Sequence, residues 1–240
     1  MLVLIGGKNK DNNLNVIEKK IFSFVKNKKP KVLFCPYATI NKIESSIIKF
    51  HNLVKDIDCE IIDLTLDNIN DFDKLLSESD ILYIAGGVSD DLVDFFKEKH
   101  LDIILKKYLE SDKILIGSSA GAMLFTNISM GDKYMFNDNF HNYNYKMVKC
   151  LNLINISICP HYQNEDLVVY NDEIRKYNLP SFGIEEDTAL VIDKNNIFVL
   201  KDIKNRSVYY FDNKNNYKMI PLYEGEKYEK DSMLRSWRNL

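Results

Sequence analysis

Residues 114–123 read ILIGSSAGAM, a run of strand-forming residues that passes through two glycines into small, helix-compatible residues. This order predicts a strand, a tight turn and a helix, with Ser119 on the turn. The flanking glycines, Gly117 and Gly121, let neighbouring backbone pass close to the strained conformation that such a serine adopts. At the N-terminus of the helix, N–H groups can stabilise a developing oxyanion. The pentapeptide therefore indicates a nucleophile elbow, and a glycine-rich turn without chemistry is the alternative.

Short apolar runs alternate with amphipathic segments in the first two-thirds of the chain. Such alternation is typical of βαβ units, whose parallel strands form a sheet with helices on both faces. We expect strands at residues 2–5, 31–35, 60–64, 81–85 and 113–116, and helices at 16–25, 43–54, 71–77, 90–99, 101–109 and from 120. The sequence thus predicts an α/β fold with a mainly parallel sheet.

The pattern changes beyond Thr126. Residues 127–144 carry many Asn, Asp, Tyr and Phe residues without periodicity, which indicates a long loop near the site. A strand at 153–159, a helix at 165–177 and extra short strands between 181 and 223 are expected to follow. Because no linker or internal repeat divides the chain, residues 1–240 are expected to form one domain.

The charge composition bears on which classes of macromolecule this protein binds. The chain contains 32 basic and 35 acidic residues, interspersed along its length, for a formal net charge of -3. This balance gives no electrostatic reason to expect nucleic acid or an anionic membrane as a partner. The apolar runs are too short for a bilayer span, and residues 1–7 resemble a first strand more than a signal peptide. We therefore expect a cytoplasmic protein.

No metal site is expected from the sequence. Four cysteines, Cys35, Cys59, Cys150 and Cys159, lack CxxC spacing and are expected to be reduced thiols, neither disulfides nor zinc ligands. No other cluster of metal ligands stands at a recognised spacing.

Glycine pairs mark the edge of the expected sheet where a ligand would bind. In open parallel sheets, ligands lie beyond the carboxyl ends of the strands. Gly6-Gly7 and Gly86-Gly87 follow two of the expected strands, so they share this edge with the elbow. The amides of Gly87 and Val88 are candidates for an oxyanion hole, and a tight turn that only closes packing is the alternative.

A serine nucleophile needs a general base, and the chain has four histidines. His51 and His100 lie in or beside charged amphipathic helices, which favours a surface position, and His141 in the polar loop stays open. His161 follows an expected strand and Pro160 at the sheet edge, which favours a catalytic place over a structural one.

A carboxylate usually orients such an imidazole, and two regions offer one. The first is the turn within residues 183–189, which holds three consecutive acids. The second is the loop after the elbow, with Asp132 or Asp138. Composition alone does not choose between the two regions.

Four separated motifs together resemble peptidase family S51, which includes aspartyl dipeptidase (peptidase E) and cyanophycinase. They are AGG at 85–87, GSSAGA at 117–122, PHY at 160–162 and GIEEDTA at 183–189, and their order and spacing span most of the chain. The family is similar in fold to class I glutamine amidotransferases, but it uses serine where those enzymes use cysteine. The resemblance therefore implies a class I glutamine amidotransferase-like fold.

The resemblance also implies roles for individual residues. Ser119 would be the nucleophile, His161 the general base and acid, and Glu186 the carboxylate that holds the imidazole. Gly87 and Val88, or the amide of Ala120, would stabilise the oxyanion. Asp132 is a further candidate acid, because an aspartate after the elbow has been proposed as a triad member in this family. The implied reaction is hydrolysis of short peptides through an acyl-enzyme, without cofactor or metal.

Substrate choice is where the sequence departs from the family. The residues after His161 lack the basic side chains of cyanophycinase-like members, which counts against a polymer substrate and favours small peptides, Asp-containing dipeptides among them. Arg175 is a candidate to pair with a substrate carboxylate, and a surface arginine is the alternative. An esterase or amidase on the same site, and a non-catalytic or regulatory amidotransferase-like protein, remain the other hypotheses. Whether the chain forms a homo-oligomer stays open.

Overall fold

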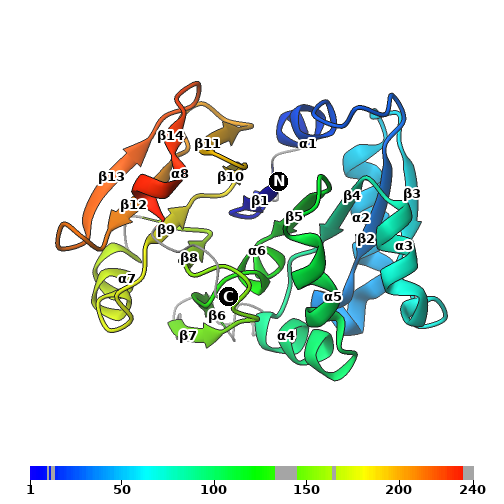
Figure 1. Ribbon diagram of the computed structural model, residues 1–240, viewed down its shortest axis with the longest axis horizontal. Helices are drawn as coiled ribbons and strands as arrows, with labels where there is room; N and C mark the ends of the chain where they lie inside the picture. The colour runs from blue at the N-terminus through cyan, green and yellow to red at the C-terminus, as the bar shows by residue number, and fades with distance from the viewer. Residues whose placement is uncertain (10, 12–13, 133–144, 164–165, 235–240) are drawn as a thin grey trace.

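The computed structural model describes residues 1–9, 11, 14–132, 145–163 and 166–234. Its main sheet has eight strands in the order β14-β11-β10-β1-β5-β4-β2-β3 (Figure 1). Five of them are parallel: β1 (Leu2–Ile5), β5 (Ile114–Ser118), β4 (Ile81–Ile84), β2 (Lys31–Cys35) and β3 (Glu60–Asp63). The antiparallel strands β10 (Thr188–Ile192), β11 (Asn196–Lys201) and β14 (Tyr228–Glu229) extend the sheet beyond β1. The predicted α/β class and mainly parallel sheet are confirmed.

Helices cover both faces of this sheet, because alternate side chains of the central strands point to opposite sides. Val3 and Ile5 share one hydrophobic cluster with α1 (Val16–Phe22) and α2 (Ile43–Val54). Leu2 and Leu4 share another with α3 (Phe72–Glu78), α4 (Ser89–Glu98), α5 (Leu101–Tyr108) and α6 (Ala120–Leu124). Burial on both faces explains why these strands are apolar at nearly every position.

Two smaller sheets complete the described structure. One has the order β13-β12-β9-β8, formed by β13 (Lys218–Leu222), β12 (Val208–Asp212), β9 (Ser181–Ile184) and β8 (Ser157–Pro160). The other pairs β6 (Ile128–Asp132) with β7 (Tyr145–Lys149). Helix α7 (Asp166–Ile174) packs beside β12 through contacts of Tyr170 with Phe211, and the short helix α8 (Lys230–Met233) follows β14.

Three local predictions need correction. The stretch from 127, expected to be a loop, begins with strand β6, where the alternation of Ile128 and Met130 with small residues buries both apolar side chains. The strand expected at 153–159 starts only at Ser157, because the amides of residues 153 and 154 donate to the carbonyl of Phe125 instead. The C-terminal tail contains β14 and α8, which the sequence did not predict.

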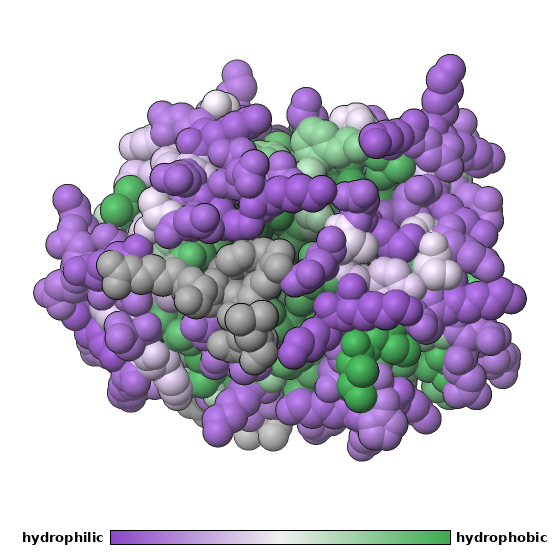
Figure 2. Space-filling view, viewed as in Figure 1, coloured by the Kyte–Doolittle hydropathy of each residue, from purple (hydrophilic) through white to green (hydrophobic). Residues whose placement is uncertain are grey.

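No helix among the described residues is long and apolar enough to cross a membrane. The surface in Figure 2 is mostly hydrophilic, with small hydrophobic areas between the charged side chains. All four cysteines are free thiols, as expected.

The topology brings several chain segments to one edge of the main sheet. The parallel register places Ser118, the last residue of β5, beside Ile5 at the end of β1. Because β10 runs antiparallel to β1, with Ala189 opposite Ile5, the turn that precedes β10 lies at the same edge. Strands β8 and β9 are parallel, with Pro160 opposite Ile184, so His161 emerges beside the start of that turn.

Candidate active site

Ser119 stands on a strained turn between β5 and α6. Its φ of 52° and ψ of -115° lie outside the regions that L-residues ordinarily adopt. A methyl group on Gly121 would come within 2.3 Å of the carbonyl oxygen of Ile84, and one on Gly117 within 2.1 Å of the carbonyl oxygen of Gly121. Both glycines are therefore needed for the close approach of β5, α6 and β4 around the serine.

Ser119, His161 and Glu186 form a continuous chain of hydrogen bonds. The Oγ of Ser119 lies 2.8 Å from Nε2 of His161, and Nδ1 of the same ring lies 2.9 Å from Oε1 of Glu186. With Nδ1–H donating to the carboxylate, Nε2 is left to accept the serine proton. The hydrogen bond from His161, the largest influence, lowers the pKa of Glu186 from its ordinary value of 4.5. The carboxylate is therefore ionised where the imidazole needs it.

Of the three consecutive acids on this turn, Glu186 alone is hydrogen-bonded to the imidazole within the described structure. Glu185 accepts hydrogen bonds from the amide of Ser207, at 2.8 Å, and the hydroxyl of Tyr209, at 3.4 Å. Asp187 is fully buried and accepts from the amide of Asn9 at 3.2 Å. The structure thus distinguishes three acids that composition alone did not.

The end of β1 holds the site together through three successive carbonyl groups. The carbonyls of residues 5, 6 and 7 accept hydrogen bonds from the amides of Ser119 (2.9 Å), His161 (2.7 Å) and Asp187 (2.9 Å), in that order. Gly7 also lies against the imidazole, since a methyl group there would come within 2.2 Å of Cε1 of His161. The glycine pair after the first strand therefore supports both the backbone and the ring of the histidine.

The oxyanion-hole hypothesis needs one correction. The amide of Val88 donates to the carbonyl of Ala38 at 2.7 Å, so it is not available to a substrate. The amides of Gly87 and Ala120 donate to no group in the described structure. Gly86 lies directly against Ser119, because a methyl group on Gly86 would come within 2.9 Å of Cβ of Ser119. Gly87 and Ala120 therefore remain the candidates for the oxyanion hole.

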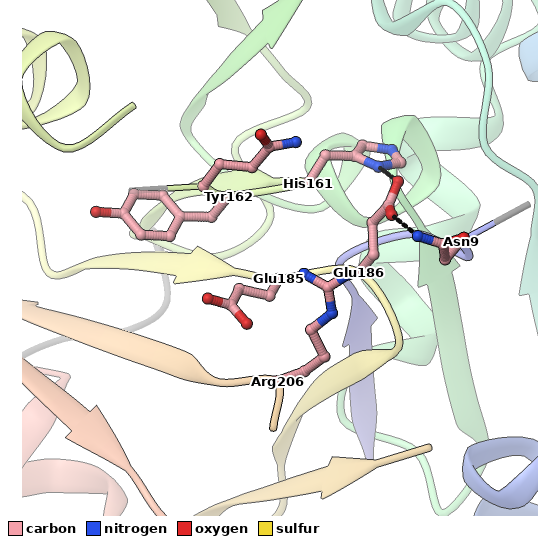
Figure 3. A pocket seen from close by; sticks show the side chains of 7 residues that line it. Asn9, His161, Tyr162, Glu185, Glu186 and Arg206 are labelled. Atoms are coloured by element: carbon pink, nitrogen blue, oxygen red, sulfur yellow. Dashed lines mark hydrogen bonds and ion pairs between the residues drawn. The ribbon is translucent and has the colours of Figure 1, made fainter. Parts of the chain in front are cut away.

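A pocket of about 350 Å³ opens beside the imidazole and the carboxylate (Figure 3). Its lining consists of Asn9, His161, Tyr162, Gln163, Glu185, Glu186 and Arg206. The Arg206 side chain extends toward Glu186 in this view, and its positive charge adds to the lowering of the pKa of that carboxylate, after the larger influence of His161. Arg206 is thus a half-buried cation that lines the pocket close to Glu186.

Arg175, the arginine predicted to meet substrate, is engaged elsewhere. Its guanidinium donates to the side-chain and main-chain oxygens of Asn216, at 2.5 and 2.9 Å, and stacks over the ring of Tyr217. Arg175 does not line the pocket described above. Arg175 was predicted to reach the site from the helix that follows His161. Its guanidinium instead binds the loop that carries Asn216.

Other predicted candidates lie apart from the triad or outside the described residues. Strand β6 ends at Asp132, whose side chain, like residues 133–144 with Asp138 and His141, lies outside the described structure. His51 pairs with Asp63 at 3.0 Å, and His100 is exposed. Among the described residues, no group of three or more His, Cys, Asp or Glu side chains is placed to hold a metal ion.

Two residues that line the pocket, Asn9 and Arg206, were not predicted from the sequence. Asn9 follows the glycine pair at the end of the first strand, so its place at the sheet edge was a usable signal. Arg206 lies between β11 and β12 and belongs to no motif. The pairing of β12 with β9 brings Arg206 beside the acidic turn and so to the pocket.

An α/β sheet that carries a strained serine, a histidine and a carboxylate at the carboxyl edge of its strands defines a hydrolase-like class of protein. The sequence profile of peptidase family S51 matches residues 1–200, and the chain belongs to this family, as the four motifs predicted.

Two curated relatives are bacterial peptidases described as uncharacterized. YgaJ of Bacillus subtilis is 26% identical over 151 residues, which cover 62% of this chain and 62% of that protein. Lmo0363 of Listeria monocytogenes is 28% identical over 109 residues, which cover 44% of this chain and 51% of that protein. The matches thus span between about half and three-fifths of these relatives' own length.

Solved structures show the same fold. A peptidase from an acI-B1 Actinobacterium superposes with a TM-score of 0.69 at 21% identity, covering 95% of this chain and 96% of that one. A putative peptidase E from Listeria monocytogenes superposes with a TM-score of 0.58 at 19% identity, covering 83% of this chain and 97% of that one.

Proposed function

We propose that this protein is a serine peptidase that hydrolyses short peptides, with Ser119 as nucleophile, His161 as general base and Glu186 as the carboxylate that orients it. The two hydrogen bonds of 2.8 and 2.9 Å that join these side chains carry the proposal. Membership of family S51 supports a peptidase over other uses of the same geometry.

The reaction follows from the arrangement of the three side chains. Nε2 of His161 takes the hydroxyl proton as Oγ of Ser119 attacks the peptide carbonyl, and the amides of Gly87 and Ala120 donate to the oxyanion that forms. The imidazolium, stabilised by Glu186, then gives this proton to the leaving amine, and an acyl-enzyme remains. A water molecule, deprotonated by the same imidazole, attacks the ester carbonyl, and the imidazolium returns the proton to Oγ of Ser119 as the acid product leaves. Neither a metal nor a cofactor is needed for these steps.

The pocket supports small, acidic peptides as the substrate class. A volume of about 350 Å³ is in the range of sites that bind small molecules. The guanidinium of Arg206 offers the paired N–H groups that bind a carboxylate, in place of Arg175. Glu185 and Glu186 add negative charge nearby, which suits a ligand that carries a free amino group as well as a carboxylate.

Two experiments test the proposal. A fluorophosphonate probe should label the wild-type protein at Ser119, and Ser119→Ala should abolish both the labelling and hydrolysis in a dipeptide panel. Undiminished hydrolysis by Ser119→Ala would refute the assigned nucleophile. Absence of labelling would favour the non-catalytic alternative, and labelling with turnover of esters but not of peptides would favour an esterase.

The substrate class is tested by Arg206→Gln in the same panel. The variant should raise KM for Asp- and Glu-containing dipeptides about tenfold and leave neutral dipeptides nearly unchanged. Lys204→Gln is the matched control, because it removes a positive charge from an exposed position two residues away. An equal loss on acidic and neutral peptides would exclude carboxylate recognition by Arg206.

A further inference from the structure

Asn9 contacts the carboxylate oxygen of Glu186 that is not hydrogen-bonded to His161. Oε1 of Glu186 accepts from the imidazole, while Oε2 accepts from Nδ2 of Asn9 at 3.0 Å, as the dashed lines in Figure 3 show. A glutamate side chain has three rotatable bonds, so a single contact would leave its terminal carboxylate free to turn. Two contacts on different oxygens fix the plane of the carboxylate, and with it the direction of the Nδ1 hydrogen bond.

The amide of Asn9 has one orientation consistent with its surroundings. Its Oδ1 accepts from the main-chain N–H of Asp11 at 3.0 Å, and its Nδ2 faces Glu186. Exchanging the oxygen and nitrogen would put a carbonyl against a carboxylate and an NH₂ group against an N–H. Both ends of the side chain would then lose their hydrogen bonds.

The backbone around Asn9 is held independently of its side chain. The amide of Asn9 donates to the buried carboxylate of Asp187, the residue after Glu186. The ammonium of the preceding Lys8 pairs with Asp202, whose side chain is fully buried, and Asp202 in turn donates its amide to the carbonyl of Asp187. Asn9 and Glu186 are therefore fixed to a common buried network, which sets the distance between them.

We propose that Asn9 is a positioning residue: it holds the carboxylate of Glu186 so that the imidazole of His161 stays aligned on the hydroxyl of Ser119. The proposal rests on the proposed function, since it assigns Asn9 to the same triad. Asn9 acts through Glu186, because its hydrogen bonds among the described residues go to Glu186, Asp187 and Asp11 and not to the serine or the histidine. The hydrogen bond that it donates also contributes to the lowered pKa of Glu186, after the larger influence of His161.

A double-mutant cycle tests this indirect action. Four proteins are compared: wild type, Asn9→Ala, Glu186→Ala and the double variant. The readouts are the rate of fluorophosphonate labelling at Ser119 and the kcat and KM for a cleaved dipeptide. Asn9→Ala should lower the labelling rate and kcat about tenfold with KM nearly unchanged, the loss expected for one hydrogen bond to a charged group. In the Glu186→Ala background the same substitution should change either rate less than about twofold.

Controls separate positioning from folding. Asp11→Ala changes an exposed side chain in the same segment, keeps the main-chain bond to Asn9, and should behave as wild type. Asn9→Asp keeps the size of the side chain but places a second carboxylate against Glu186, so it should lower kcat at least as much as Asn9→Ala. If Asn9→Ala impairs folding, the isosteric Asn9→Asp supplies the cycle.

Equal losses with and without Glu186, or a fall in thermal stability with unchanged labelling, would overturn the role of Asn9. The labelling readout also separates this outcome from failure of the proposed function. A wild-type protein that is labelled but cleaves no peptide would refute the peptidase proposal, while the dependence of labelling on Asn9 would still be measured.

Discussion

Gly7→Ala should displace the imidazole of His161. A methyl group at this position would lie 2.2 Å from Cε1 and 2.7 Å from Nε2 of His161, whereas ordinary contact begins near 3.4 Å. The ring must therefore move by about 1.2 Å to admit it. A misplacement of about 1 Å at a reacting group costs on the order of 100-fold in rate, or about 2.7 kcal/mol of transition-state stabilisation.

The measurement is the labelling rate of Ser119 together with kcat/KM for a cleaved peptide. Gly225→Ala is the matched control, since Gly225 also has a positive φ, of 88°, but a methyl group there meets nothing within 4 Å. Both variants should lose some stability through backbone strain, about 1 kcal/mol. Only Gly7→Ala should lose activity, and wild-type rates in that variant would refute the rigid contact between residue 7 and the imidazole.

Three further outcomes are expected. Glu186→Gln should lower kcat by about 10⁴-fold with a smaller change in KM, because a neutral amide no longer stabilises the imidazolium. Steady-state kinetics would show it, and a loss confined to KM would contradict the assigned role. Gly121→Ala should abolish either folding or the labelling of Ser119, because its methyl group would lie 2.3 Å from the carbonyl oxygen of Ile84. Circular dichroism and fluorophosphonate labelling measure the two, and a folded, fully labelled variant would show that the turn can relax. Burial raises the pKa of Glu18 from 4.5 to about 7 in the folded state, so wild-type stability should fall as the pH rises from 4.5 to 7. Relative to wild type, Glu18→Gln should therefore gain up to about 3 kcal/mol between pH 4.5 and pH 8 in urea unfolding, and an equal effect at both values would contradict this.

The parallel part of the fold could be predicted from the sequence because its central strands are buried on both faces, although the edge strand β3 is only partly buried. Such strands read as short apolar runs between amphipathic helices, and the expected and observed positions differ by a few residues at most, as at the end of α1. Strand β6 was not predicted, because its sequence pattern is short. Its alternation of apolar and small residues is brief, and the Asn-rich sequence that follows masks it.

The site was predictable where its residues belong to motifs and not where they depend on packing. The elbow, the residue after Pro160 and the acidic turn are each recognisable locally, and the family resemblance joined them. Arg206 could not be found this way, because it reaches the pocket only through the pairing of β12 with β9. The hydrogen bond from the amide of Val88 to the carbonyl of Ala38 could not be predicted either, since Ala38 lies in another βα connection.

The residues at the end of β1 and directly after it hold the strained residues of this site in place. Ser119, His161 and Asp187 all have positive φ, at 52°, 53° and 62°, a conformation that costs non-glycine residues on the order of 1–3 kcal/mol each. Such residues persist only where their surroundings over-determine them, and each of the three donates its amide to one of the successive carbonyls of residues 5–7. The backbone of residues 5–7 thus fixes the positions of three segments that are distant in the sequence. A displacement of β1 along its axis would misplace Ser119, His161 and the acidic turn together, so stability of the first strand and activity should be lost in parallel.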